Sequence, residues 1–540
     1  MHWINADAVR AGLGVLLALV ASPHGWAGEP YRLQDNQLID VHYRPEPTAT
    51  DSGQTAFARE RERISNERAR SRTDTGDRTR QPAAGTRVAA GARYEEALQL
   101  FLDGQLDAAL ERLSEDRLQP EAAAAKQTPE DSARGWLLRG KILALRLDFA
   151  GADRAYTEAV KVAPVFFEAW FQYGNFHHQR NRHREARLGY QRALPLARED
   201  GTEAEVAQIL NNLGVVHSEE NRKAAARRAH EEALRIRRAL AQQDPESYLP
   251  ALAESLTNLG VLHRAENRQA DARRVYEEAL RIRRELEHEN PGDYLPDIAI
   301  TLNNLGNLHR QENRHAHARR AYEEALRIRR ELAEKNPDLY LPDVAVTLNN
   351  MGTLDRDESH WTGAREGYEE ALRIYRTLEQ KNPEAFRAFV AITLNNLGAL
   401  HRDDNRQADA RQAYEEALRI YRALAQMNSD VFLPYVAMAL NNLGVLHQDE
   451  IRLADARQSY EDALRIRRTL AQKNPATYLP DVALSLYNLG LLHRAANRMV
   501  DARSAFEEAR NIFSRFVARA PATYESPLRT VEKNLAELGE

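Results

Sequence analysis

The sequence predicts an all-α fold, a solenoid in which pairs of antiparallel helices stack along the chain. Three observations lead to this prediction. A motif of the type LNNLG recurs every 46 residues, no insertion or deletion changes that interval, and each copy contains two one-sided helical patterns. The glycines of the motif are Gly214, Gly260, Gly306, Gly352, Gly398, Gly444 and Gly490. One pair of helices cannot bury both of its apolar stripes, whereas stacked pairs can.

The copy around Gly306 shows both helical patterns. In its first half, apolar residues and one histidine follow at intervals of three and four residues, and they are Ile298, Leu302, Leu305 and His309. In its second half the same intervals connect Ala318, Ala321, Ala325, Ile328 and Leu332. Such intervals place residues on one face of an α-helix. We expect ENR to separate the two helices, and KNPDLYLPD, with its prolines, to separate successive copies.

Upstream of these copies the repeat is shorter. Trp136, Gly140, Ala152, Tyr156 and Ala159 recur 34 residues later as Trp170, Gly174, Ala186, Tyr190 and Ala193. These spacings resemble the tetratricopeptide repeat, whose small residues let two helices cross closely. The 46-residue copies look like its lengthened form, as in kinesin light chains and long bacterial repeat arrays. The resemblance extends from about Gly91 to the C-terminus and implies a right-handed superhelical solenoid of nine to ten copies.

These patterns divide the chain into six predicted segments. They are a signal peptide (1–27), a charged, disordered linker (28–88), a degenerate helical repeat (91–130), two 34-residue repeats (133–200), seven 46-residue repeats (201–515) and a C-terminal capping helix (516–540). The linker carries interleaved acidic and basic residues and few large apolar ones, so it cannot bury a core.

The N-terminal segment has the features of an export signal. Ala11 to Ala21 form an apolar run of signal-peptide length, and small residues at Gly25 and Ala27 suit cleavage after Ala27. Asp7 and Arg10 leave the region ahead of it without a clear positive charge. The alternatives are an incidental apolar N-terminus and an uncleaved anchor. We expect a cleaved, exported chain, periplasmic or secreted, whose mature form has no membrane-spanning segment.

Composition excludes several classes of function. The chain contains no cysteine, so disulfides, thiol catalysis and thiolate metal sites are absent. Its formal net charge of -5 lacks the basic excess of a nucleic-acid-binding protein. We find no catalytic residue, no cofactor motif and no metal-ligand set. GWLLRGKI, which begins at Gly135, is not a phosphate loop, because Ile142 stands where Ser or Thr is required.

A histidine recurs near the end of each predicted first helix. The positions are His177, His217, His263, His309, His401, His447 and His493, with Asp355 in one copy. Neighbouring helices lie about 8–10 Å apart, whereas the ligands of one zinc ion lie about 2 Å from it. Successive histidines therefore cannot share a metal ion, and we interpret them as packed side chains.

Two asparagines at the centre of each first helix are the candidate binding residues. On a helical wheel, Asn303 and Asn304 lie opposite the packed stripe of Leu302 and Leu305. The asparagines at the first position are Asn211, Asn303, Asn349, Asn395 and Asn441. Those at the second position are Asn212, Asn258, Asn304, Asn350, Asn396, Asn442, Asn488 and Asn534. An arginine row follows one turn later, with Arg264, Arg310, Arg356, Arg402 and Arg494. In the family that the repeats resemble, the first helices line a concave groove, so these side chains are expected to face it.

A carboxamide offers a donor and an acceptor together, so it can pair with any peptide group. In kinesin light chains, similar asparagines resemble such a ladder. The leading hypothesis is therefore an exported scaffold that binds extended protein segments in this groove, with acidic segments favoured by the arginines. The alternative for the asparagines is that they bond only to neighbouring helices and water. A second function is a structural component of an envelope or secretion complex that docks partners on its outer helices. An enzyme is the third and least favoured option.

Overall fold

The structure is a computed structural model that describes residues 90–118, 128–146, 148–180, 182–220, 222–518 and 521–539. The predicted signal peptide and the predicted linker, 28–88, lie outside these residues. Within them every regular element is an α-helix, which confirms the predicted all-α class. None of the described helices has the length and apolarity required to cross a membrane.

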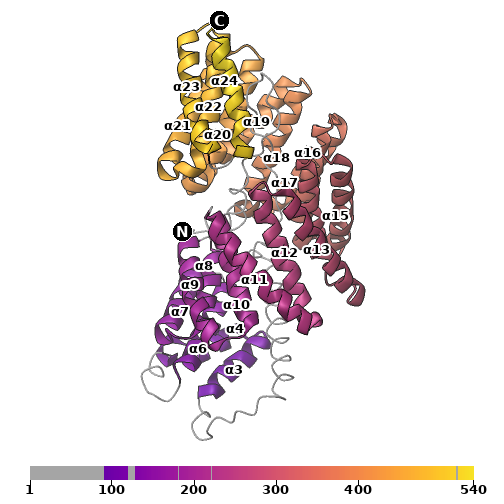
Figure 1. Ribbon diagram of the computed structural model, residues 1–540. Coiled ribbons are helices and arrows are strands. Elements are labelled where there is room, and N and C mark those ends of the chain that lie inside the picture. Colours follow the sequence, from indigo (N-terminus) through magenta and orange to yellow (C-terminus); the bar gives the residue numbers. More distant parts are fainter. Residues whose placement is uncertain are drawn as a thin grey trace. The chain divides into compact units, whose positions relative to one another are not determined.

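The described helices form two compact units, drawn in Figure 1 from indigo to yellow along the chain. One unit contains α3 (Ala90–Leu102), α4 (Leu106–Arg112), α6 (Pro129–Leu145), α7 (Phe149–Val162), α8 (Phe167–Gln179), α9 (His183–Asp200), α10 (Glu203–Glu219) and most of α11 (Lys223–Gln243). The other contains α12 (Pro245–Ala265), α13 (Gln269–Glu289), α14 (Leu295–Gln311), α15 (His315–Lys335), α16 (Pro337–Asp357), α17 (Trp361–Lys381), α18 (Pro383–Asp403), α19 (Gln407–Met427), α20 (Ser429–Asp449), α21 (Leu453–Lys473), α22 (Pro475–Ala495), α23 (Met499–Val517) and α24 (Pro521–Glu537).

In the second unit, consecutive helices from α12 to α24 pack against one another. The even-numbered helices α12 to α22 are the first helices of the copies, and the odd-numbered helices α13 to α23 are the second helices. A first helix also contacts the first helix of the next copy, as α14 does with α16 and α16 with α18. Every copy thus touches mainly its neighbours, which is the packing of a solenoid.

The turn between the two helices of a copy explains the recurring ENR. Asn313 adopts a left-handed conformation with φ of 56°, and the N–H of Arg314 bonds back to the carbonyl of His309 at 2.8 Å. Asparagine is one of the few side chains that tolerate this conformation. The same position is left-handed in Asn267, Ser359, Asn405, Ile451 and Asn497.

The segment expected to separate successive copies is itself almost entirely helical, which corrects that prediction. Asn336 accepts a hydrogen bond from the N–H of Leu339 at 3.3 Å, and Pro337 is the first residue of α16. An asparagine cap followed by proline is a favoured helix start, because proline has no N–H to leave unpaired. The extra residues of the long repeat therefore lengthen its helices instead of forming a linker.

Two kinds of contact hold a second helix to the first helix of the next copy. In the first kind an almost fully buried arginine bonds to the start of that helix. Arg329 donates to the carbonyl of Asp343 at 2.9 Å and to Oγ1 of Thr347 at 2.6 Å. Arg283 and Arg467 make the equivalent contacts to Thr301 and Ser485.

In the second kind an aromatic ring replaces the arginine. Tyr375 stacks on Phe389 with ring centroids 5.2 Å apart, and Tyr421 stacks on Tyr435 at 5.3 Å. Phe389 occupies the position of Asp343 in the preceding copy. The array therefore exchanges a polar contact for an aromatic one by changing both partners together.

We predict that this exchange can be engineered. Tyr375→Arg alone leaves a buried charge facing Phe389 and should destabilise the array by about 3–5 kcal/mol. Thr393 already stands at the position of Thr347, and adding Phe389→Asp supplies the carboxylate that interacts electrostatically with the buried arginine in the equivalent pairs of Arg283 with Asp297 and Arg467 with Asp481. The double variant should therefore restore most of that loss. Chemical denaturation measures both changes. A double variant no more stable than the single variant would contradict this interpretation.

Candidate functional site

The candidate asparagines form hydrogen-bonded pairs between neighbouring first helices. The second asparagine of one copy donates from Nδ2 to Oδ1 of the first asparagine in the preceding copy. The pairs are Asn350 to Asn303 at 3.1 Å, Asn396 to Asn349 at 3.3 Å, Asn442 to Asn395 at 3.0 Å and Asn488 to Asn441 at 3.0 Å. We call this series the asparagine ladder.

The ladder changes where the motif departs from two asparagines. Asn534 in α24 faces the hydroxyl of Tyr487 at 3.5 Å. Thr257, which takes the first position in α12, donates to the carbonyl of Ala253 in its own helix. In the first unit Asn212 donates to Asn175, which lies one turn further along its helix than the expected position.

Burial of the ladder is more complete than the sequence suggests. Asn303, Asn304 and Asn307 have no exposed surface in the full-length chain, and thirteen consecutive residues of α14, Ile298 to Arg310, are buried. Asn258, Asn349, Asn350, Asn395, Asn396, Asn441, Asn442 and Asn488 are all less than a tenth exposed. The ladder is thus a buried polar layer, where each hydrogen bond matters more than it would in water.

Each inter-copy bond uses only half of a carboxamide. Within the described residues, the buried Nδ2 atoms of Asn303, Asn349 and Asn441 have no hydrogen-bond partner. Because their Oδ1 atoms accept from the next copy, the orientation of each amide group is fixed. The result is a set of oriented N–H donors. A buried donor without an acceptor costs about 1–3 kcal/mol, so the set favours an incoming carbonyl.

In α14, α16, α18 and α20 an apolar side chain precedes the first asparagine by one helical turn, and in α22 Leu484 precedes Tyr487 in the same way. The other four are Ile300, Val346, Ile392 and Met438, and all five are less than a tenth exposed. Residues three apart on a helix are neighbours on its surface. Each copy around the ladder therefore combines one apolar contact with one polar contact.

Acidic residues of the same copy or of the next copy lie beside four of the five arginines in the row. Arg310 forms an ion pair with Asp357, and Arg494 with Glu537 at 2.7 Å. Arg402 pairs with Asp403 at 2.8 Å, and its Nε lies 3.7 Å from Asp449. Nε of Arg356 lies 3.8 Å from Asp403.

Sequence reasoning missed these acids, although an aspartate directly follows the arginine position in HRDD, DRDE and HQDE. Gln311 stands at that position in the copy that follows Arg264. Burial lowers the pKa of Arg264, and the neighbouring Arg310 adds to the shift while Tyr276 and Tyr322 oppose it. Sites for acidic ligands are therefore fewer than the arginine row alone indicates.

One described cluster brings possible metal ligands together. Asp355, Glu358 and His360 place one ligand atom each within 4.8 Å of one another. However, Arg319 donates to both carboxylates, so one of their two negative charges is already compensated. The predicted absence of a metal site stays a prediction.

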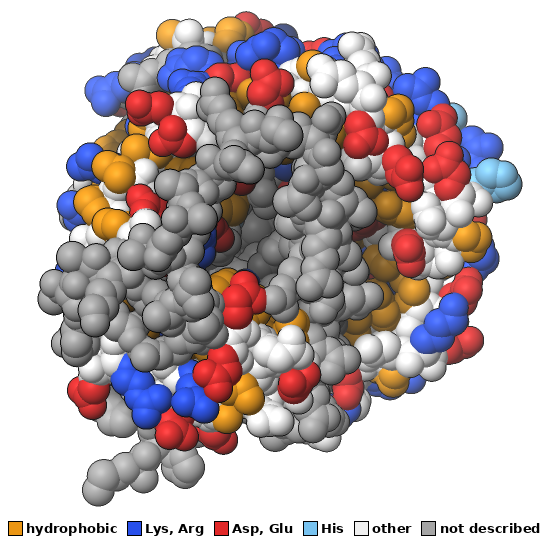
Figure 2. Space-filling view, turned by 90° about the horizontal axis from the view of Figure 1, so that it is seen from below, with side chains coloured by type: hydrophobic (Ala, Val, Ile, Leu, Met, Phe, Trp, Pro, Cys, Tyr) orange, Lys and Arg blue, Asp and Glu red, His pale blue; other side chains and the backbone are white. Residues whose placement is uncertain are grey.

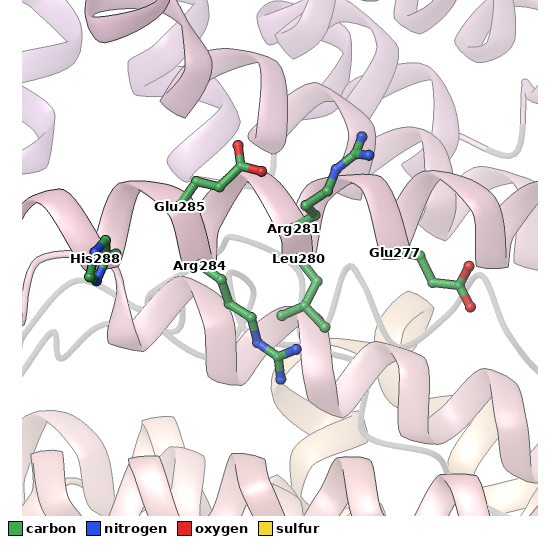
Figure 3. Close-up of a pocket in the computed structure, with 6 residues that line it drawn as sticks. All are labelled: Glu277, Leu280, Arg281, Arg284, Glu285 and His288. Carbon is green, nitrogen blue, oxygen red and sulfur yellow. The ribbon is translucent and has the colours of Figure 1, made fainter.

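The outer surface of the second unit presents mixed charge. Arginine of one second helix pairs with glutamate of the next, as Arg330 does with Glu370 at 2.8 Å and Arg468 with Glu508 at 2.7 Å. Figure 2 shows acidic and basic side chains interspersed over the described surface. An open pocket of about 550 Å³ on α13 is lined by Glu277, Leu280, Arg281, Arg284, Glu285 and His288, and Figure 3 shows Leu280 between charged neighbours.

The match to family models agrees with this architecture. The tetratricopeptide repeat family matches residues 166–239, 286–331, 343–423 and 435–515, and a second description of the same repeat matches 252–289. No curated protein matches the chain. The crystal structure of BtubC (BKLC) from P. vanneervenii is 24% identical with a TM-score of 0.37, over 47% of this chain and 92% of that one. The apo form of RapI is 14% identical with a TM-score of 0.49, over 71% and 98%.

The histidine row predicts how stability depends on pH. Burial lowers the pKa of His309, His401, His447 and His493, and that of His177 to about 4. Because these folded-state values lie below about 6.5, the unfolded chain binds more protons as the pH falls through that value. Stability from this row is therefore present above about pH 6.5 and is lost toward the folded-state pKa values.

One histidine acts in the opposite direction. Burial opposes protonation of His178, but the charge and the 2.9 Å hydrogen bond of Glu219 outweigh it and raise its pKa. We expect the melting temperature to fall from pH 7 to pH 5, since the row outnumbers this residue. The triple change His309→Gln, His401→Gln and His447→Gln should flatten that slope. An unchanged slope in thermal unfolding would refute the assignment to the row.

Proposed function

Since the chain belongs to the tetratricopeptide repeat family, a family of protein–protein interaction scaffolds, we propose that it is an exported scaffold that binds extended protein segments along the asparagine ladder. The observation that carries the proposal is the set of buried, oriented Nδ2 donors at Asn303, Asn349 and Asn441. An extended segment is the ligand that brings one carbonyl to each of several such donors.

Peptide carbonyls suit these donors better than side-chain groups do. Every residue of a partner carries a carbonyl, whatever its side chain. A ladder repeated in nearly identical form over consecutive copies therefore recognises a backbone more than a particular sequence. Because each net hydrogen bond contributes about 1 kcal/mol, affinity should accumulate over several copies.

The acidity of the partner is a separate question. The arginine row predicts a preference for acidic segments, but Asp357, Asp403, Asp449 and Glu537 lie beside four of its five members. An acidic ligand would have to compete with these carboxylates. We therefore expect charge to modulate binding without determining it.

Docking on the outer surface is the alternative function. The pocket on α13 exposes Leu280 between arginines and glutamates, so a partner with mixed charge could pack there. The two surfaces lie on different helices, α12 to α22 for the ladder and α13 to α23 for the outer surface, so they can be probed separately.

Crosslinking distinguishes the two surfaces. The chain has no cysteine, so Ala399→Cys, at a partly exposed position one turn after Asn395, and Glu323→Cys on α15 each provide a single attachment point for a photoreactive label. We expect the natural partner to crosslink at position 399 and not at 323. Asn349→Asp with Asn395→Asp, which removes two donors and keeps two acceptors, should reduce its capture. Capture at 323 alone, unaffected by the double change, would instead identify the outer surface.

Export is tested independently of binding. We predict that the natively produced protein begins at Gly28, because Gly25 and Ala27 suit signal cleavage after Ala27. Intact-mass measurement of the protein from the exported fraction gives the answer directly. Recovery of the complete chain from the cytoplasm would rule the proposal out.

A further inference from the structure

We infer that the bound segment adopts a polyproline II conformation and places an apolar side chain at every third residue. This inference rests on the proposed function, and it names the class of ligand for the same site. It follows from the spacing of the ladder, from the apolar residue beside each donor and from the compensated charges.

The spacing comes from the packing of the first helices. The helices α14, α16, α18 and α20 contact one another in sequence, and carboxamides bridge them with bonds of 3.0–3.3 Å. Helices in direct contact lie about 8–10 Å apart. Equivalent donors therefore recur at about that interval along the ladder.

Only one regular backbone conformation repeats at this interval. A polyproline II helix has three residues per turn and a rise of 3.1 Å, so it presents the same face about every 9 Å. A β-strand returns to the same face about every 7 Å, and an α-helix advances about 5.4 Å per turn. Polyproline II also leaves its carbonyls without internal hydrogen bonds, so they remain available to the donors.

The flanking apolar residues have the same period. Each donor has its own apolar neighbour one turn earlier, and the four pairs are Ile300 with Asn303, Val346 with Asn349, Ile392 with Asn395 and Met438 with Asn441. All eight side chains are less than a tenth exposed in the full-length chain, so a segment contacts them only where the atoms that cover them move aside, and it is then desolvated. An apolar side chain at every third position of the ligand would meet each of these residues in turn.

The ends of the ladder set the length of the segment. Thr257 takes the first position before Asn303, and Tyr487 takes it after Asn441. Four first-position asparagines thus lie between them, three of which have a buried Nδ2 without a partner among the described residues. At three residues for each position they correspond to about twelve residues of polyproline II. Because the arginines beside these donors pair with acids, the segment needs no charge pattern of its own.

Two synthetic peptides test the period. The first is fluorescein-labelled Leu-Pro-Pro repeated four times, and the second has the same composition with its leucines in two adjacent pairs. We expect the full chain to bind the first at least tenfold more tightly, by fluorescence anisotropy. Versions of six, nine, twelve and fifteen residues should gain affinity up to twelve and not beyond.

A matched pair of variants assigns the effect to the ladder. Asn349→Asp keeps the oxygen that accepts from Asn396 and removes the Nδ2 donor, so it should weaken the first peptide about fivefold. Because it also buries a carboxylate, its melting temperature should fall, and binding is compared at a temperature at which both the variant and the unchanged chain are folded. Glu323→Gln on α15 should change neither the affinity nor the melting temperature. If both peptides bind equally and Asn349→Asp weakens both, the predicted three-residue period of the ligand is refuted. The proposed function is then left intact. Failure of both peptides to bind would also overturn the inference, and crosslinking at position 399 would then decide the proposed function by itself.

Discussion

The fold depends on the close approach of a glycine in each first helix to an aromatic ring in the second helix of the same copy. A Cβ on Gly306 would lie 2.4 Å from Cε1 of Tyr322, closer than atoms can pack. The ring has no exposed surface, and its hydroxyl donates to Oδ1 of Asn307 at 2.8 Å. The contact therefore fixes both the separation of the two helices and the side of the first helix that faces the next copy.

Two layers build on this contact, and they tolerate change differently. Between a second helix and the next copy, the same position is filled by arginine in some copies and by tyrosine in others, as Arg329 and Tyr375 show. Between first helices, the asparagine ladder keeps nearly the same chemistry in four consecutive bonds between copies, from Asn303 to Asn488. A contact that only holds helices together can vary as long as both partners vary together. The constancy of the ladder is better explained if a third group must also fit it.

Sequence patterns predicted the part of the structure that depends on helical periodicity. The glycine at the position of Gly306 recurs in every copy, and the position of Tyr322 always carries a tyrosine or another ring. The helix pairs and their packed faces could therefore be predicted. The partner of each asparagine could not, because Asn303 bonds to Asn350, 47 residues away, and this pairing depends on how far one helix is displaced along the next. The ion pair of Arg310 with Asp357 has the same separation and was missed for the same reason. A helical wheel gives the direction of a side chain within one helix, but it contains no information about the neighbouring helix.

The structure also changes what the asparagines can do. The sequence allowed two readings, in which they bind a partner or bond only to neighbouring helices. In the ladder, the oxygen of Asn349 is used by Asn396, while its Nδ2 has no partner among the described residues. The bond between copies therefore does not compete with binding. It holds the amide in one orientation, so a ligand carbonyl meets a donor whose conformational entropy has already been lost. Such preorganisation depends on the packing of neighbouring copies, which makes the intact array, and not the single repeat, the unit that can bind.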